Sequence, residues 1–392
     1  MIIVNLMWSS DKPLVEVLKG IKDIPKILWN YCPYGELPEK VHFLQLLRSC
    51  GIVGVIQSSA PLHKMGIQFS YVFGTPGDPQ LDRELEEFAK VLSTIKKMRG
   101  LRIGQIATRY EQMTGTYVDE FRMFEKLGIT LVPISAHEMF DISGKISEAE
   151  VNSFIQNLKD NFEIVDVPER ALYYAVRASM AVGRVVAEKE LAAVAVQDFN
   201  DELHKLFKTR PQLWVPEFTE KGVVVGMEGD VSSTLALWIQ RQLGDTTPMY
   251  VEILTFDQKE NTILIGHASM HDPVLAGDNK IIVVRDFECE KTDEVEGAWL
   301  HFSAKPGPVT FANLYNDISN YRLTVFTGTA LPVQEKLEGY THALVKIDQP
   351  LGEFFKKIIN LGMTQHFSVS YDRVESKIEK FCAMTHIDYV KI

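Results

Sequence analysis

Apolar residues show two different patterns of spacing along the first 245 residues. Short runs rich in Val and Ile predict buried strands at 1–8, at 51–59 (GIVGVIQSS) and at 67–74. Apolar positions at helical spacing predict helices elsewhere, and a long one covers residues 81–100 and ends in the basic cluster KKMRG. Strands that alternate with helices in this way are typical of a parallel α/β sheet.

A second series of strands and helices begins at residue 101. Its last strand reads VVVGMEGD and is followed by a helical pattern with Leu235, Leu237, Ile239 and Leu243 as the apolar positions. This series predicts a second α/β unit, and its expected strands are at 101–107, 129–135, 191–199 and 223–230.

The pattern changes after Pro248, where short strands with period-two alternation are separated by Gly, Pro, Asn and Asp. Such a pattern predicts a β-rich domain. The sequence therefore predicts two Rossmann-like parallel-sheet domains followed by a β-rich C-terminal domain. The expected boundaries are 1–99, 100–245 and 246–392.

Composition narrows the class of partner. The formal net charge of −11 argues against a nucleic-acid surface and against binding to anionic membranes. It suits a neutral small molecule or a metal cation, although solubility alone would explain it as well. The N-terminus is not typical of a signal peptide, and no apolar run is long enough to cross a membrane, so we expect a cytoplasmic protein. No CxxC pair indicates a zinc ribbon or a disulfide framework among Cys32, Cys50, Cys289 and Cys382.

Two carboxylates, Glu228 and Asp230, follow directly after a predicted buried strand. In open α/β sheets, ligands bind at the carboxyl ends of strands. Asp230 or Ser232 could cap the helix that follows. Capping does not account for Glu228, which makes it the stronger candidate for chemistry.

Three further residues could hold a metal or move a proton. Glu252 lies within the predicted strand MYVEIL, His267 follows the strand ILIG, and His366 follows a predicted helix. Each could instead be an ordinary solvated carboxylate or a hydrogen-bonded core histidine. If they meet Glu228 in a cleft between the second and third domains, two carboxylates and two imidazoles would suit Mn²⁺ or another divalent transition metal.

Several segments together resemble the L-fucose/L-arabinose isomerase superfamily. They are GMEGD at 226–230, GHAS at 266–269, KPGPVTFANLYND at 305–317, YRLTVFTGTALP at 321–332 and QHFSVSYD at 365–372. The resemblance covers about residues 100–392 and implies a metal site between the second and third domains. It implies metal ligands at Glu228, Glu252, His267 and His366.

The resemblance also implies an activity, namely metal-dependent interconversion of an aldose and a ketose through an enediol. The expected substrate is a pentose or a 6-deoxyhexose, and Glu228 and Glu252 are the expected proton carriers. Glu252 is preferred over Asp257, and His63 is a candidate sugar contact of the first domain. Asp230 is a candidate to support the metal ligands, with helix capping as its alternative role.

In this superfamily a neighbouring subunit often closes the active site, so the resemblance implies a homo-oligomer, a trimer or a hexamer. Two other functions stay open at this point. One is related enediolate chemistry, such as epimerisation or a reaction of a modified sugar. The other is a non-catalytic sugar-binding protein, which would have no need of two carboxylates at a metal.

Overall fold

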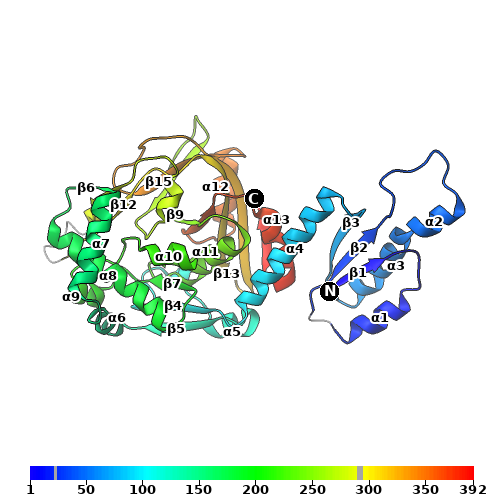
Figure 1. Ribbon diagram of the computed structural model, residues 1–392, viewed down its shortest axis with the longest axis horizontal. Coiled ribbons are helices and arrows are strands. Elements are labelled where there is room, and N and C mark those ends of the chain that lie inside the picture. The colour runs from blue at the N-terminus through cyan, green and yellow to red at the C-terminus, as the bar shows by residue number, and fades with distance from the viewer. Residues whose placement is uncertain (22–23, 289–294) are drawn as a thin grey trace. The chain divides into compact units, whose positions relative to one another are not determined.

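The computed structural model describes residues 1–21, 24–288 and 295–392, so Cys289 lies outside the described residues. These residues form two compact units (Figure 1). The first consists of Met1–Lys96 and Lys377–His386, and the second of Lys97–Ser376 and Ile387–Ile392.

The first unit is a three-layer α/β/α arrangement around a parallel sheet of order β1-β2-β3. The strands are β1 (Ile2–Asn5), β2 (Ile27–Tyr31) and β3 (Ser70–Gly74). The helices are α1 (Lys12–Lys19), α2 (Phe43–Ser49), α3 (Gly51–Lys64), α4 (Pro79–Met98) and α13 (Glu375–Thr385). One face of the sheet buries Leu18, Leu28, Leu62 and Ile67, and the other buries Ile27, Val72, Leu81 and Phe88.

The strand predicted at 51–59 is wrong, because this segment is the first part of helix α3. Its buried residues are spaced at helical intervals, and α3 packs against β1 and β2. Gly51 permits that close approach, since a Cβ atom there would lie 2.1 Å from the Asn5 carbonyl oxygen. The central strand of this sheet is instead β2, which was not predicted.

The second unit contains the predicted second α/β sheet, which is parallel and has the order β5-β4-β7-β8. Its strands are β4 (Arg102–Ile106), β5 (Thr130–Ile134), β7 (Ala193–Val196) and β8 (Val224–Met227). The chain runs from β4 to β5 on one side and later to β7 and β8 on the other, so the strand order reverses between β4 and β7. The helical segments that precede β8 are η1 (Thr114–Thr116), α5 (Glu120–Leu127), α6 (Ala136–Ser143), α7 (Glu148–Asn161), α8 (Glu169–Glu188), α9 (Asp201–Phe207) and α10 (Pro216–Lys221).

The β-rich part of the second unit is a seven-stranded sheet of order β13-β16-β9-β10-β15-β14-β17, and an extra pairing of β13 with β14 closes six of the strands into a ring. These strands are β9 (Met249–Asp257), β10 (Thr262–His267), β13 (Gly307–Asn316), β14 (Tyr321–Ala330), β15 (Thr341–Ile347), β16 (Phe367–Ser370) and β17 (Asp388–Lys391). A smaller sheet contains the strands β6 (Glu163–Val165), β11 (Ile282–Arg285) and β12 (Ala298–His301). The helical segments η2 (Pro273–Ala276) and α12 (Leu351–Asn360) complete the unit.

Helix α11 (Val231–Leu243) joins the two large sheets of the second unit. It contacts β7 and β8 of the parallel sheet and β13 and β16 of the antiparallel sheet, and residues 231–240 are all buried. A helix that is buried all round belongs in a core. Its first turn thereby brings the end of β8 close to the residue that precedes β16.

The architecture confirms the predicted fold class of parallel α/β sheets and a β-rich C-terminal part. Within the described ranges, no helix is both long and apolar enough to cross a membrane.

Candidate metal centre

Glu228 lies in a tight turn between β8 and α11. Its backbone adopts the left-handed conformation, with φ +59°, and Gly229 follows with φ +68°. A Cβ atom at position 229 would lie 2.6 Å from the carbonyl oxygen of Thr108, so only glycine fits there. The backbone N–H of Glu228 donates to Oδ1 of Asp198 over 3.0 Å, which anchors this turn to the end of β7.

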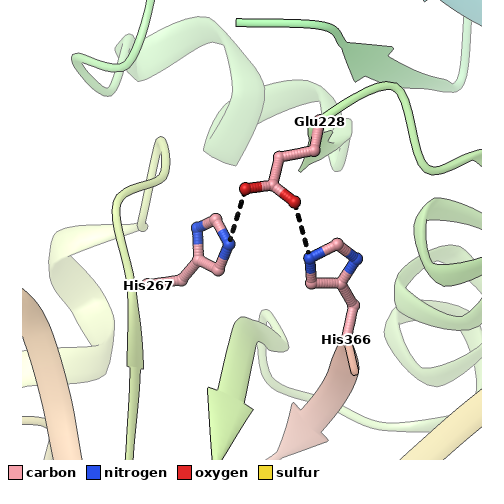
Figure 2. A group of neighbouring side chains, drawn as sticks. All are labelled: Glu228, His267 and His366. Carbon is pink, nitrogen blue, oxygen red and sulfur yellow. Dashed lines mark ion pairs between the residues drawn. The ribbon is translucent and has the colours of Figure 1, made fainter. Parts of the chain in front are cut away.

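Glu228, His267 and His366 converge from three different strand ends (Figure 2). Figure 2 shows one carboxylate oxygen of Glu228 directed at each imidazole ring. Its Oε2 is 2.9 Å from Nε2 of His366, and its Oε1 is 3.7 Å from Nε2 of His267. All three residues are buried, and one potential ligand atom from each lies within 4.8 Å of the others.

Hydrogen bonds fix the tautomer of both histidines. Nδ1 of His366 donates to Oδ2 of Asp230 over 2.9 Å, and Nδ1 of His267 donates to the carbonyl oxygen of Ala268 over 2.7 Å. The ionised carboxylate of Asp230 and the carbonyl oxygen of Ala268 can only accept, so the proton of each ring lies on Nδ1. Both rings therefore present Nε2 to Glu228, and a carboxylate behind a histidine is the usual support for a metal ligand.

The electrostatics of this group suit a cation. Burial disfavours charge on His366, yet its contacts with Asp230 and Glu228 raise its pKa to about 10. Burial also acts against the charge of Glu228, but the two histidines hold its pKa below the usual value. Among the described residues, Oε2 of Glu228 and Nε2 of His366 have no hydrogen-bond partner of good geometry in spite of their short separation. A metal ion at this point would satisfy both atoms in place of the proton.

Glu252 lies beside this group, opposite Gly266 on the neighbouring strand. Its Oε1 is 3.6 Å from Nε2 of His366, and its side chain is 32% exposed. It also lines a cavity of about 80 Å³ together with Glu228 and His267. The structure thus brings all four predicted residues to one place in the second unit.

The other candidates lie in different surroundings. Asp257 is at the exposed end of β9, where its Oδ1 accepts from the backbone N–H groups of Lys259 and Glu260 in a turn. Asp230 both caps α11, by accepting from the N–H of Ser233 over 2.9 Å, and holds His366. His63 lies in the first unit and lines a separate cavity there.

Sequence reasoning missed a buried charged network behind the site. Asp198 accepts from the Glu228 backbone and, through Oδ2, from Nε2 of Gln212 over 2.5 Å. Burial raises the pKa of Asp198 to about 6 against the opposing charge of Arg210. Arg210 in turn donates twice to Asp286, over 2.7 Å each. Asp198 could have been found, because it follows strand β7 just as Glu228 follows β8.

Tyr250 is a second residue that the sequence did not single out as functional. Its buried ring packs against both imidazoles, with ring centroids 5.0 Å from His267 and 4.9 Å from His366, and the two imidazoles also contact each other at 5.5 Å. Its hydroxyl donates to the carbonyl oxygen of Met227 over 3.2 Å. Tyr250 therefore buttresses both histidines and links β9 to the end of β8.

Comparison with known proteins shows that the sequence is similar to sugar isomerases. The chain is 22% identical over 385 residues to proteins named sulfoquinovose isomerase in Priestia aryabhattai and in Priestia megaterium, which spans 98% of this chain and 83% of each relative. A protein of the same name in Alkalicoccus urumqiensis is 20% identical over 392 residues, 100% of this chain and 86% of the relative. No protein-family model matches the chain. These similarities indicate an aldose–ketose isomerase, which confirms the predicted enzyme class.

Proposed function

We propose that this protein is a divalent-metal-dependent aldose–ketose isomerase that acts on sulfoquinovose or a closely related sulfonated hexose. The observation that carries the proposal is the buried group of Glu228, His267 and His366. Similarity to proteins named sulfoquinovose isomerase along 98% of the chain supports the choice of substrate. Sulfoquinovose carries a sulfonate in place of the 6-hydroxyl of glucose. It is therefore itself a 6-deoxyhexose, the class expected alongside pentoses from the sequence.

The proposed metal ligands are Glu228, Glu252, His267 and His366. Two imidazoles favour Mn²⁺ or another divalent transition metal over Mg²⁺, which prefers oxygen ligands. When bound, such an ion would act as a Lewis acid on neighbouring sugar oxygens and make the adjacent C–H group more acidic.

The protein's own part in the proposed reaction is to move one proton between C2 and C1. Glu252 borders the cavity and is partly exposed, so it can reach a bound sugar. Glu228 is kept ionised by its two histidine neighbours, as its lowered pKa indicates. We assign these two carboxylates as the proton carriers, one to accept the proton from carbon and one to assist its return to the neighbouring carbon.

The deciding experiment is NMR in D₂O with added Mn²⁺ on sulfoquinovose, on its uncharged analogue quinovose, and on a panel of aldopentoses and 6-deoxyhexoses. We expect deuterium at C1 or C2 and formation of the ketose, both lost with EDTA. Glu252→Gln should slow exchange by about 10²- to 10⁴-fold, the usual contribution of a general acid or base. Asp257→Asn is the matched control, because it removes a carboxylate from the exposed end of the same strand.

Two results would contradict the proposal. Deuterium in an epimer without any ketose would indicate an epimerase. No exchange with any sugar, in protein that demonstrably holds the metal, would favour a binding role. The homo-oligomer, either a trimer or a hexamer, and the cytoplasmic location remain predictions that sedimentation and fractionation can test separately.

A further inference from the structure

A larger cavity of about 940 Å³ adjoins the candidate metal centre. It is lined by residues that follow β4 and by residues that follow β7, the two strands between which the strand order reverses. Ligands of open α/β sheets bind at such a point. Phe199, Arg210 and Glu288 line both this cavity and the smaller one beside Glu228, so a single extended ligand could occupy the two.

The loop that leaves β4 has a strained backbone. Ala107 and Thr108 are consecutive non-glycine residues in the left-handed region, with φ of 59° and 75°. Strain of this kind is held by its surroundings and clusters at ligand-binding sites. Here the loop packs against the turn that carries Glu228, since a Cβ atom at Gly229 would lie 3.1 Å from Cα of Arg109. The backbone of Arg109 is thereby fixed relative to the metal centre.

Arg109 and Lys205 are the cations that this cavity can offer to a ligand. Within the described part of the chain, neither pairs with a carboxylate, and the Arg109 guanidinium lies 4.4 Å from the ring centroid of Tyr117. A stacked guanidinium keeps the N–H donors of its edge free for an oxyanion. Arg210, the third cation of the lining, is instead held by Asp198, Asp286 and Glu288.

The rest of the lining suits a polyhydroxylated ligand rather than a bare anion. Glu202 is 3.1 Å from His137 and Glu288 pairs with Arg210, which leaves Glu111 and Asp201 as the remaining carboxylates of the lining. Carboxylates and amides hydrogen-bond sugar hydroxyls readily. The amide side chains of the lining are Gln105, Gln112, Gln197 and Asn200.

We propose that Arg109, assisted by Lys205, binds the sulfonate of a sulfonated sugar whose carbonyl end lies at Glu228, His267 and His366. This inference rests on the proposed function, and it assigns a residue that discriminates a sulfonated sugar from an uncharged one. A sulfonate is ionised at every physiological pH and offers three oxygens to a cation. A charge-assisted hydrogen bond from Arg109 therefore adds affinity for this end of the ligand alone.

The test is calorimetric titration of sulfoquinovose and of quinovose into protein that carries Glu252→Gln to prevent turnover. Because Glu252 is also a proposed metal ligand, metal analysis first establishes that this variant holds Mn²⁺. In this background Arg109→Gln should raise the Kd for sulfoquinovose about 10- to 100-fold, as expected for loss of a charge-assisted contact, and leave the Kd for quinovose unchanged. Lys205→Gln is a second variant at an exposed helix position and should have a smaller effect in the same direction.

Arg102→Gln is the matched control, because it removes the same charge from the opposite end of β4. It should leave both Kd values unchanged. The inference is overturned if sulfoquinovose does not bind, if Arg109→Gln weakens both sugars equally, or if the control acts like Arg109→Gln. Deuterium exchange by protein with Glu252 intact separates the two proposals. Arg109-dependent binding without exchange would refute the isomerase alone, and exchange that Arg109→Gln does not impair would refute the sulfonate contact alone.

Discussion

Asp230 shows how one carboxylate serves both the fold and the site. One oxygen accepts from the N–H of Ser233 and caps α11, and the other accepts from Nδ1 of His366. Capping and support of the site were alternatives on the sequence alone. The structure makes both contacts at once because the helix begins where β8 ends, beside the residue that precedes β16.

Asp230→Asn separates the two contacts, since asparagine is as good a helix cap as aspartate. The metal-free protein should keep its fold, while the Mn²⁺ affinity should fall about 10- to 100-fold because His366 loses its anionic partner. Titration calorimetry with Mn²⁺ measures this difference, and Asp257→Asn serves as the control. Unchanged Mn²⁺ affinity would mean that Asp230 acts only as a cap.

The Mn²⁺ affinity measured in that titration should depend on pH. In the metal-free protein, Asp230 and Glu228 raise the pKa of His366 to about 10 although burial opposes its charge. A proton then competes with the metal for Nε2 at neutral pH, so the Mn²⁺ affinity should rise as the pH rises toward 10. Wild type and Asp230→Asn are therefore compared at several pH values.

At the scale of elements, α11 holds the site together because it packs against both large sheets. The sequence predicted only the apolar positions of this helix, yet polar residues such as Gln240 are buried as well. Nε2 of Gln240 donates to the carbonyl oxygen of Thr310, and its Oε1 accepts from Ser368. Those partners are 70 and 128 residues away in sequence, so no local pattern could reveal that the polar positions are also covered.

The packing of α11 on β8 depends on Gly226. A Cβ atom at this position would lie 2.0 Å from Oγ1 of Thr234 and 3.1 Å from its Cβ. Gly226→Ala should therefore destabilise the protein by about 1–3 kcal/mol, the usual cost of overpacking. Thr234→Ala removes the closest atom, so the double variant should recover part of that loss, as urea denaturation can measure. Strict additivity of the two substitutions would show that they do not meet.

The same distinction between local and distant signals explains what the sequence predicted. Glu228 and His267 were found because each ends or follows an apolar strand, and Glu252 because its neighbours are apolar. The segment 51–59 was misread as a strand because its apolar run hides a helical spacing that Gly51 and Gly54 complete. The sequence did not reveal the role of Arg210, since its partner Asp286 is 76 residues away in sequence.

At the scale of the whole molecule, the chain forms two compact units, and the four candidate ligands all lie in the second. The division into three domains at residues 99 and 245 remains a prediction. Within the second unit the parallel and antiparallel sheets share α11, so the candidate metal centre forms only when both sheets are folded. Metal binding should therefore stabilise this unit as a whole.

Metal removal tests that coupling. A ligand present at 100 times its Kd stabilises the folded state by about 2.7 kcal/mol. Differential scanning calorimetry with Mn²⁺ should therefore show the transition of the second unit several degrees above its position in EDTA, with the transition of the first unit unmoved. Glu228→Gln is the control, because it should abolish the shift by removing a ligand. Equal shifts of both transitions would mean that the metal stabilises the chain elsewhere, and no shift in wild type would mean that Glu228, His267 and His366 hold no metal.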